Sequence, residues 1–187
     1  LTKKARVDVV LYAIVTHKSS PLSFSVPYKA FTCKSVGEVF FSSLVDLEKA
    51  VKRYRDQNVS FHCENPEIIR QNRNKPTHEE KRPREAEISA IEFVLNLIEK
   101  YRIKGKICHL STKEGLRKII DAKQRGVSVT CEVTPHHLYF DDSMDLQMNP
   151  VRSKPRHSVG AAGLPMAGRT SNGVNPPLRQ PEDRLAL

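Results

Sequence analysis

Short runs of apolar residues alternate along the chain with segments in which apolar residues recur at three-and-four spacing. Continuous short runs are typical of strands in a covered parallel sheet, and three-and-four spacing is typical of amphipathic helices. The strands predicted in this way are Val7–Val15, Tyr28–Cys33, Val59–His62, Lys106–His109 and Val127–Val133. Strands that alternate with helices predict an α/β fold around a parallel sheet.

Three amphipathic helices are expected between these strands. Their apolar positions are Leu44, Leu47, Val51 and Tyr54 in the first, Ile88, Ile91, Val94, Leu95 and Ile98 in the second, and Leu116, Ile119, Ile120 and Ala122 in the third. Gly105 and Gly126 follow the second and third helices, at positions where glycine commonly ends a helix. The polar, basic segment Asn72–Pro83 is predicted to be a long loop between a strand and a helix, of the kind that often covers a barrel's site.

The hydrophobic periodicity stops at Val151 and does not resume before Val174. Pro, Gly, Ser, Arg and Ala dominate this stretch, as is typical of linker or irregular sequence. Its flanks, Met148-Asn149-Pro150 and Val174-Asn175-Pro176-Pro177, resemble one motif that was split and partly copied. We therefore expect three parts, namely a partial barrel over 1–150, an irregular basic insertion over 151–174 and a continuation of the barrel over 175–187.

The chain has 187 residues, whereas a complete eight-stranded α/β barrel takes about 250. The predicted strands account for about five of its eight strand-helix units. The first residue is Leu1 rather than Met, and an apolar run follows almost at once. We therefore interpret the sequence as part of a TIM-type (β/α)8 barrel.

Composition and charge narrow the class of protein. No apolar run approaches the roughly 20 residues of a membrane helix, and no secretory signal pattern opens the chain, so a soluble, cytoplasmic protein is expected. The four cysteines lack CxxC spacing and are expected to be reduced and mostly buried. Of the net charge of +10, eight charges come from the loop-like segments 70–84 and 151–187. Clustered loop charge is usually solvated, so no nucleic-acid partner is expected.

Two histidines stand at the carboxyl ends of predicted parallel strands, His62 in Val-Ser-Phe-His-Cys-Glu-Asn and His109 in Lys-Ile-Cys-His-Leu-Ser-Thr. Catalytic groups of α/β barrels collect at that end of the strands. Imidazoles held on rigid strands suit zinc and related metals. One such histidine alone is more often a hydrogen-bonded core residue, but the matching placement of two favours a shared metal site.

Lys29 lies inside the otherwise apolar run Val-Pro-Tyr-Lys-Ala-Phe-Thr-Cys. A buried lysine is costly unless it is paired or chemically altered. Reaction of the neutral amine with carbon dioxide would give a carbamate, which can bridge two metal ions as a carboxylate does. A lysine that reaches solvent from the strand end is the alternative, and the residues alone favour that alternative.

His136 and His137 follow the last predicted strand in Val-Thr-Cys-Glu-Val-Thr-Pro-His-His-Leu. Consecutive residues of a strand point to opposite sides, so at most one of the two is expected to face a site directly. The alternative is that both histidines position a loop.

Four motifs, in their order along the chain, resemble the dihydroorotase family. They are Phe61-His62-Cys63-Glu64-Asn65, Cys108-His109-Leu110-Ser111-Thr112, the run Val129–Leu138 with its Thr-Pro-His-His-Leu, and Asn175-Pro176-Pro177-Leu178-Arg179. The similarity extends from about residue 5 to the end, apart from 151–174. The last two motifs are the specific ones, since the related hydantoinases and allantoinases more often carry Cys-Pro-His-Tyr.

The resemblance implies an amidohydrolase barrel with two metal ions, usually Zn²⁺, and reversible hydrolysis of dihydroorotate to carbamoyl aspartate in pyrimidine synthesis. His62 and His109 would match the two single-histidine metal ligands, and Lys29 would match the carboxylated lysine. Asn175, or Asn149 in the split copy, would match the asparagine that contacts the substrate.

Two parts of the family pattern are missing from this sequence. It contains no His-x-His pair, and it ends before the strand that is expected to carry the catalytic aspartate, so no catalytic residue is identified. The chain alone is therefore expected to be inactive. The alternatives are a related amidohydrolase that acts on hydantoin or allantoin, and a non-catalytic protein of barrel origin that acts through partners, as a homo-oligomer or with a transcarbamoylase.

Overall fold

The computed structural model describes residues 6–35, 37–144 and 174–187. Within them five strands form one sheet, β1 (Ala13–Ile14), β2 (Tyr28–Phe31), β3 (Asn58–His62), β4 (Lys104–Ile107) and β5 (Val129–Cys131). The strands lie in sequence order, and each pairs in parallel with the next. The predicted α/β class with a parallel sheet is confirmed. The first strand is shorter than expected, and Val10 and Leu11 before it are exposed.

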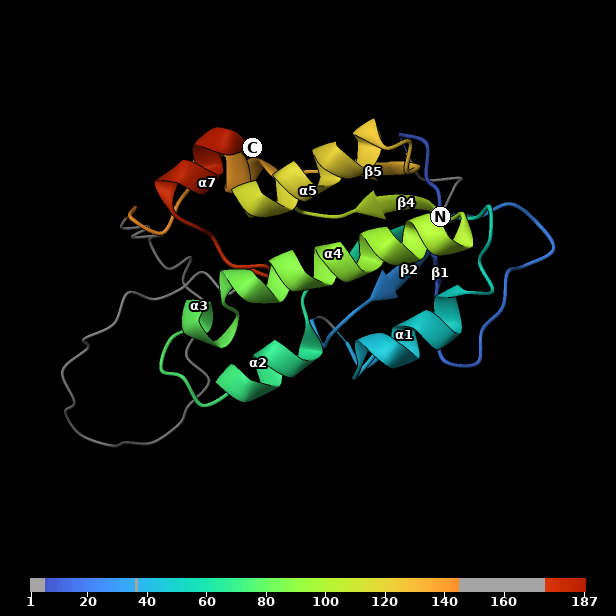
Figure 1. The fold of residues 1–187 in the computed structure, drawn as a ribbon, viewed down its shortest axis with the longest axis horizontal. Coiled ribbons are helices and arrows are strands. Elements are labelled where there is room, and N and C mark those ends of the chain that lie inside the picture. Colours follow the sequence, from blue (N-terminus) through green and yellow to red (C-terminus); the bar gives the residue numbers. More distant parts are fainter. Residues whose placement is uncertain (1–5, 36, 145–173) are drawn as a thin grey trace.

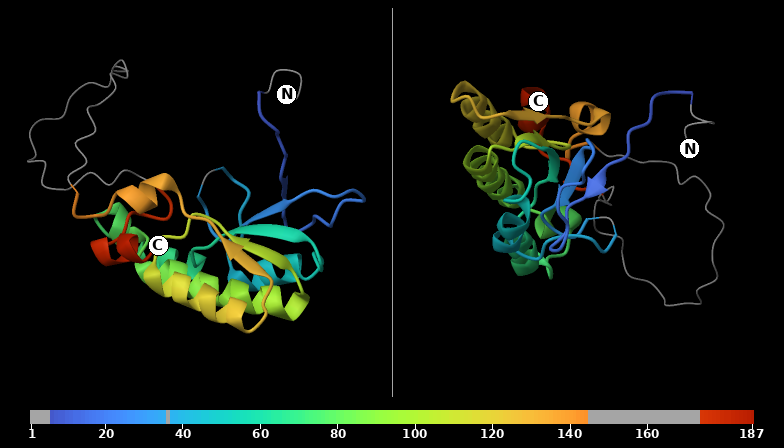
Figure 2. Two further views of the ribbon diagram at one scale, coloured as in Figure 1. Left: turned by 90° about the horizontal axis from the view of Figure 1, so that it is seen from above. Right: turned by 90° about the vertical axis from the view of Figure 1, so that its right-hand side faces the viewer.

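The helices of the described residues include the three that the apolar spacing predicts. They are α1 (Leu44–Val51), α2 (Pro66–Asn72), α3 (His78–Lys81), α4 (Arg84–Tyr101), α5 (Lys113–Gln124), α6 (Pro135–Tyr139) and α7 (Pro181–Ala186). Figures 1 and 2 show α1, α4 and α5 side by side on one face of the sheet. None of the helices in the described ranges has both the length and the apolar character needed to cross a membrane.

The register of the sheet separates an apolar row from a polar row. Tyr28, Val59, Gly105 and Val129 are aligned across four strands and are buried in the core. Gly105 in this row approaches Ile98 of α4, so the row faces the helices. Lys29, Ser60, Lys106 and Thr130 form the next row across the strands. Because side chains alternate along a strand, this polar row points to the opposite face.

Gly105 does not have the role that the sequence predicts. It lies inside β4, while α4 ends at Arg102, which itself adopts the left-handed conformation with φ of 54°. A Cβ at position 105 would lie 2.2 Å from Cδ1 of Ile98, so the glycine permits the close approach of helix and strand. Gly126, by contrast, has φ of 87° directly after the C-cap residue of α5, as predicted.

The segment Asn72–Pro83 is not the continuous loop that was predicted. It contains α3, whose N-terminus is closed by a capping box in which Thr77 and Glu80 bond to each other's backbone N–H groups. A capping box satisfies two amide groups that a helix start leaves unpaired, so four residues suffice for a helical turn. Arg82 directly follows this turn and becomes important at the site.

The predicted insertion 151–174 lies outside the described residues except for Val174. From there the chain runs beside α3, α5 and α6 and ends in α7. His78 Nε2 lies 2.9 Å from the carbonyl oxygen of Val174, and the amide of Asp142 donates to the carbonyl of Arg179 at 2.8 Å. Residues 174–187 are therefore fastened near the carboxyl ends of β4 and β5.

The four cysteines are free thiols, as expected. Cys33, Cys63 and Cys108 are buried, and Cys131 is half-buried.

Candidate metal centre

His62 and His109 come together at the carboxyl edge of the sheet. His62 is the last residue of β3, and His109 lies two residues beyond β4 with φ of 41°. Nδ1 of His62 is 3.0 Å from Nε2 of His109, and the ring centroids are 4.8 Å apart. The side chain of His62 is 1% exposed. The two imidazoles therefore lie next to each other at the ends of neighbouring strands.

Lys29 lies on the same face of the sheet as His62, because its neighbour two residues on, Phe31, is aligned with His62. It is half-buried, and its Nζ is 5.3 Å from the centroid of the Phe31 ring. Burial first, and then the charges of His62 and Lys29, lower the pKa of His109 to about 3. His109 is therefore a neutral imidazole, the form in which histidine binds metal.

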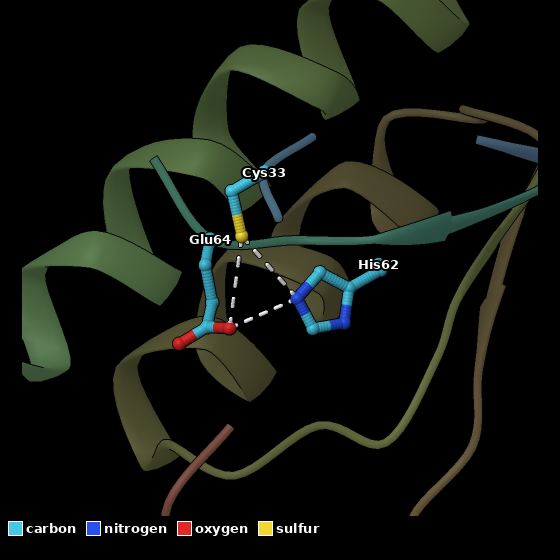
Figure 3. Close-up of side chains that lie close together, drawn as sticks. All are labelled: Cys33, His62 and Glu64. Carbon is cyan, nitrogen blue, oxygen red and sulfur yellow. Dashed lines mark hydrogen bonds and ion pairs between the residues drawn. The ribbon is translucent and has the colours of Figure 1, made fainter. Parts of the chain in front are cut away.

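A buried carboxylate contacts His62 at the ring nitrogen that does not face His109. Figure 3 shows Cys33, His62 and Glu64 with their polar atoms turned toward one another. Oε2 of Glu64 lies 2.9 Å from Nε2 of His62, and Sγ of Cys33 lies 3.5 Å from the same nitrogen. Arg82 donates to Glu64 as well. Burial alone would raise the pKa of Glu64, but the hydrogen bond from His62 and the positive charges outweigh burial and lower it.

The three ligand atoms of Cys33, His62 and Glu64 lie within 4.8 Å of one another, as metal ligands could. The guanidinium of Arg82 already pairs with the carboxylate and places a positive charge there, which speaks against a cation between the three groups. Burial, followed by the charge of Glu64, raises the pKa of the Cys33 thiol to about 12. We interpret this cluster as hydrogen-bonded support for His62.

The donor set at the two histidines does fit a metal ion. Both imidazoles are buried or nearly so, and Nδ1 of His109 is buried without a hydrogen-bond partner in the described part of the chain. A buried ring nitrogen without a partner is costly unless a ligand satisfies it. Lys29 adds a third group on the same face of the sheet.

His136 and His137 lie in α6 rather than in a strand, so alternation between two strand faces does not apply to them. His137 is buried, with Nδ1 2.7 Å from Oγ1 of Thr134 and Nε2 3.1 Å from the carbonyl oxygen of Pro176. Burial is the main cause that lowers the pKa of His137 to about 4. His137 thus fastens the segment that begins at Val174, while His136 is half-buried beside it.

Asn175 is held at the same edge of the fold. Its Nδ2 lies 3.5 Å from Oγ of Ser35, and its Oδ1 is buried without a partner among the described residues. No contact joins it to His62 or His109 among the hydrogen bonds of the described ranges. The alternative, Asn149, lies outside the described residues.

Sequence reasoning did not identify a group of buried charged residues behind the histidines. Arg179 donates to Oγ of Ser111 at 3.1 Å and to the carbonyl of Arg82 at 2.8 Å, and Ser111 donates to Glu87. Burial raises the pKa of Glu87, although the charge of Arg179 opposes this. Glu64 and Arg179 did stand in motifs quoted above, whereas Arg82 belonged to a segment interpreted as solvated charge.

A large cavity lies elsewhere. Its volume is about 730 Å³, and it is lined by residues at the amino ends of the strands, including Asn58, Lys104 and Val127. The titratable groups gather at the carboxyl ends instead. We place the candidate site there, because a reaction needs those groups and an open sheet necessarily leaves hollows elsewhere.

No family model matches the chain. Its sequence is 36% identical over 163 residues to the dihydroorotase of Thermococcus kodakarensis, covering 86% of this chain and 31% of that protein. It is 34% identical over 160 residues to the dihydroorotase of Pyrococcus furiosus, covering 86% and 30%. With the dihydroorotase of Staphylococcus aureus it shares 30% identity over 203 residues, covering 98% and 41%. The chain thus spans 30–41% of the length of these relatives.

Solved structures give the same fold. The L-hydantoinase (dihydropyrimidinase) of Arthrobacter aurescens superposes with a TM-score of 0.71 at 20% identity, covering 96% of this chain and 40% of that one. A D-hydantoinase superposes with a TM-score of 0.63 at 23% identity, covering 84% and 33%. At these identities the likeness shows the fold alone, a part of a TIM-type barrel. By its sequence, and over about a third of its relatives' length, the chain belongs to the dihydroorotase family.

Proposed function

We propose that this chain supplies part of a site that hydrolyses a cyclic amide, dihydroorotate, reversibly to carbamoyl aspartate. The observation that supports this most is the convergence of His62 and His109 from neighbouring parallel strands, with their nitrogens 3.0 Å apart. They lie at the edge of the sheet where barrel enzymes collect their catalytic groups. The relatives named dihydroorotase give the substrate class.

His62, His109 and Lys29, the last as a carbamate, would together hold a metal pair. Zinc is the ion we propose, because imidazole and carboxylate-like oxygen are among its usual ligands. When bound, such a pair lowers the pKa of a shared water and polarises the amide carbonyl. Carboxylation would also turn the cation of Lys29, which now acts on His109, into an anion.

The other residues of the chain would orient the ligands and the substrate. Glu64 holds His62, and Arg179 links the segment after Val174 to Ser111 beside His109. Oδ1 of Asn175 is buried and has no partner among the described residues, so it can accept a hydrogen bond from a ring N–H of the substrate. This supports Asn175 as a substrate-contacting asparagine, while the alternative, Asn149, lies outside the described residues.

We propose that the chain has no activity by itself. Two histidines and a lysine leave each ion short of ligands, and the sequence contains no His-x-His pair to complete them. The missing groups would come from further barrel units, and a homo-oligomer or a transcarbamoylase is the partner to look for.

A cytoplasmic location follows from the proposed role in pyrimidine synthesis. Hydantoin is the second candidate substrate class, because the structural neighbours are named hydantoinases.

The test is a chimera in which this chain replaces the matching third of the Thermococcus kodakarensis dihydroorotase. We expect it to hydrolyse dihydroorotate in preference to hydantoin, while the isolated chain hydrolyses neither. His62→Ala should reduce turnover at least about 100-fold, since it removes a metal ligand. His17→Ala, at an exposed turn, is the matched control and should leave turnover unchanged. A folded chimera that is inert, or one that His62→Ala does not impair, would refute the proposal.

A further inference from the structure

We infer that Glu64, held by Arg82, is a positioning residue. It keeps the proton of His62 on Nε2, so that Nδ1, which faces His109, is unprotonated. Its significance for catalysis rests on the proposed function, but the proton arrangement itself is a property of this chain.

Glu64 is rigidly placed. Its side chain is 0% exposed, and Oε2 is bound by both Arg82 and His62. The hydroxyl of Thr32 accepts from the backbone N–H of Glu64 at 2.8 Å and lies 2.7 Å from the carbonyls of both His62 and Glu64. The backbone that carries the imidazole and the carboxylate is therefore pinned to the loop after β2.

The hydrogen bonds order the protons along this line. A carboxylate paired with arginine only accepts, so the nitrogen of His62 that faces it must carry the proton. In neutral His62 the other nitrogen, Nδ1, is then an acceptor. It lies 3.0 Å from Nε2 of His109, which must donate to it. Nδ1 of His109 is left bare, and this is the buried nitrogen without a partner.

This ordering gives His62 the form that metal binding needs. Histidines that ligate metals usually donate their second ring N–H to a carboxylate or carbonyl, and this fixes which nitrogen is the ligand. Glu64 is such a carboxylate, in place before any ion binds. The reverse tautomer of His62 would place a lone pair against the lone pairs of Oε2, so the buried pair excludes it.

The test is the tautomer of each histidine in the metal-free chain at pH 7.5, read from long-range ¹H–¹⁵N spectra of the rings. We expect His62 and His109 both to carry one proton, on Nε2. In Glu64→Leu no side-chain acceptor from position 64 faces Nε2 of His62, so the proton is no longer held there and a population with the proton on Nδ1 should appear, with Nε2 of His109 as its acceptor. In Glu64→Gln the amide oxygen can take the place of Oε2, which Arg82 and His62 both contact, so the wild-type pattern should be retained.

The matched control is Glu92→Leu, which removes the same charge from a surface pair with Lys118 and should leave both tautomers unchanged. A proton on Nδ1 of wild-type His62, or Nε2–H fully retained in folded Glu64→Leu, would overturn the inference. Should Glu64→Leu not fold, the wild-type pattern at His62 and His109 decides alone. Because no metal is added, failure of this test leaves the proposed hydrolase chemistry standing. An inert chimera would in turn refute the proposed function and leave the proton arrangement of His62 standing.

Discussion

Arg84, the first residue of α4, donates to the carboxylate of Asp183 in α7, across 99 positions of sequence. The other oxygen of Asp183 accepts from the backbone N–H of Lys113 at 2.9 Å, at the start of α5. Asp183 is fully buried. One carboxylate therefore joins the last helix to the starts of two others, and it acts as a structural group rather than as the catalytic aspartate of the family pattern.

Asp183→Asn should loosen α7. The amide can keep the bond to Lys113 but loses the charge that pairs with Arg84, so we expect a loss of about 1.5–3 kcal/mol in the free energy of unfolding. Urea unfolding measures the loss, and hydrogen exchange of the α7 amides should quicken. Glu182→Gln, at an exposed neighbouring position, is the control and should change little. Equal losses in the two variants would show that the carboxylate of Asp183 has no special role.

His137 should make stability fall on acidification. Its pKa is about 4 in the folded chain, against 6.5 as the usual value. A histidine with a depressed pKa stabilises the fold fully above the unfolded value, and the contribution is lost as pH falls from 6.5 toward 4. Between pH 7.5 and pH 5 the wild type should lose about 2 kcal/mol more than His137→Gln, in which the amide can still bond to the carbonyl of Pro176. His109 contributes in the same direction in both proteins, so it cancels in the comparison. An equal loss of stability in the wild type and in His137→Gln would show that protonation of His137 does not destabilise the fold.

Gly105 should resist substitution because of Ile98. Gly105→Ala should lower the free energy of unfolding by about 1–3 kcal/mol, since the added Cβ would lie 2.2 Å from Cδ1 of Ile98. Ile98→Val removes that methyl group and should itself cost about 0.5–1.5 kcal/mol. The double variant should then lose less than the sum of the two single losses, as measured by urea unfolding. Additive losses would mean that the contact with Ile98 is not the reason for the glycine.

The local patterns of the sequence predicted the sheet, three helices and the two strand-end histidines. The strands were predicted from short continuous apolar runs and the helices from apolar residues at three-and-four spacing, and neighbouring residues alone determine both patterns. The two histidines were placed by their position at the ends of such runs. Gly105 was misplaced because Arg102 took the left-handed position that glycine usually fills. The local pattern gave no sign of this exchange.

Pairings between distant segments could not be predicted in the same way. Glu64 stood in a quoted motif, but its partner Arg82 lies 18 positions away in a segment that resembles solvated surface charge. Asn175 and Ser35 are 140 positions apart. Only the fold brings such groups together, so the orientation of His62 and the burial of Arg179 became visible only in the structure.

The central claim, that His62 and His109 hold the metal pair, is tested most directly by the zinc content of the purified chimera and of its histidine variants. We expect about two zinc ions per complete site, as for a two-metal hydrolase. His62→Ala and His109→Ala should each lower this number by about one or abolish binding, whereas His17→Ala should leave it unchanged. Full zinc content in folded His62→Ala and His109→Ala proteins would contradict the account.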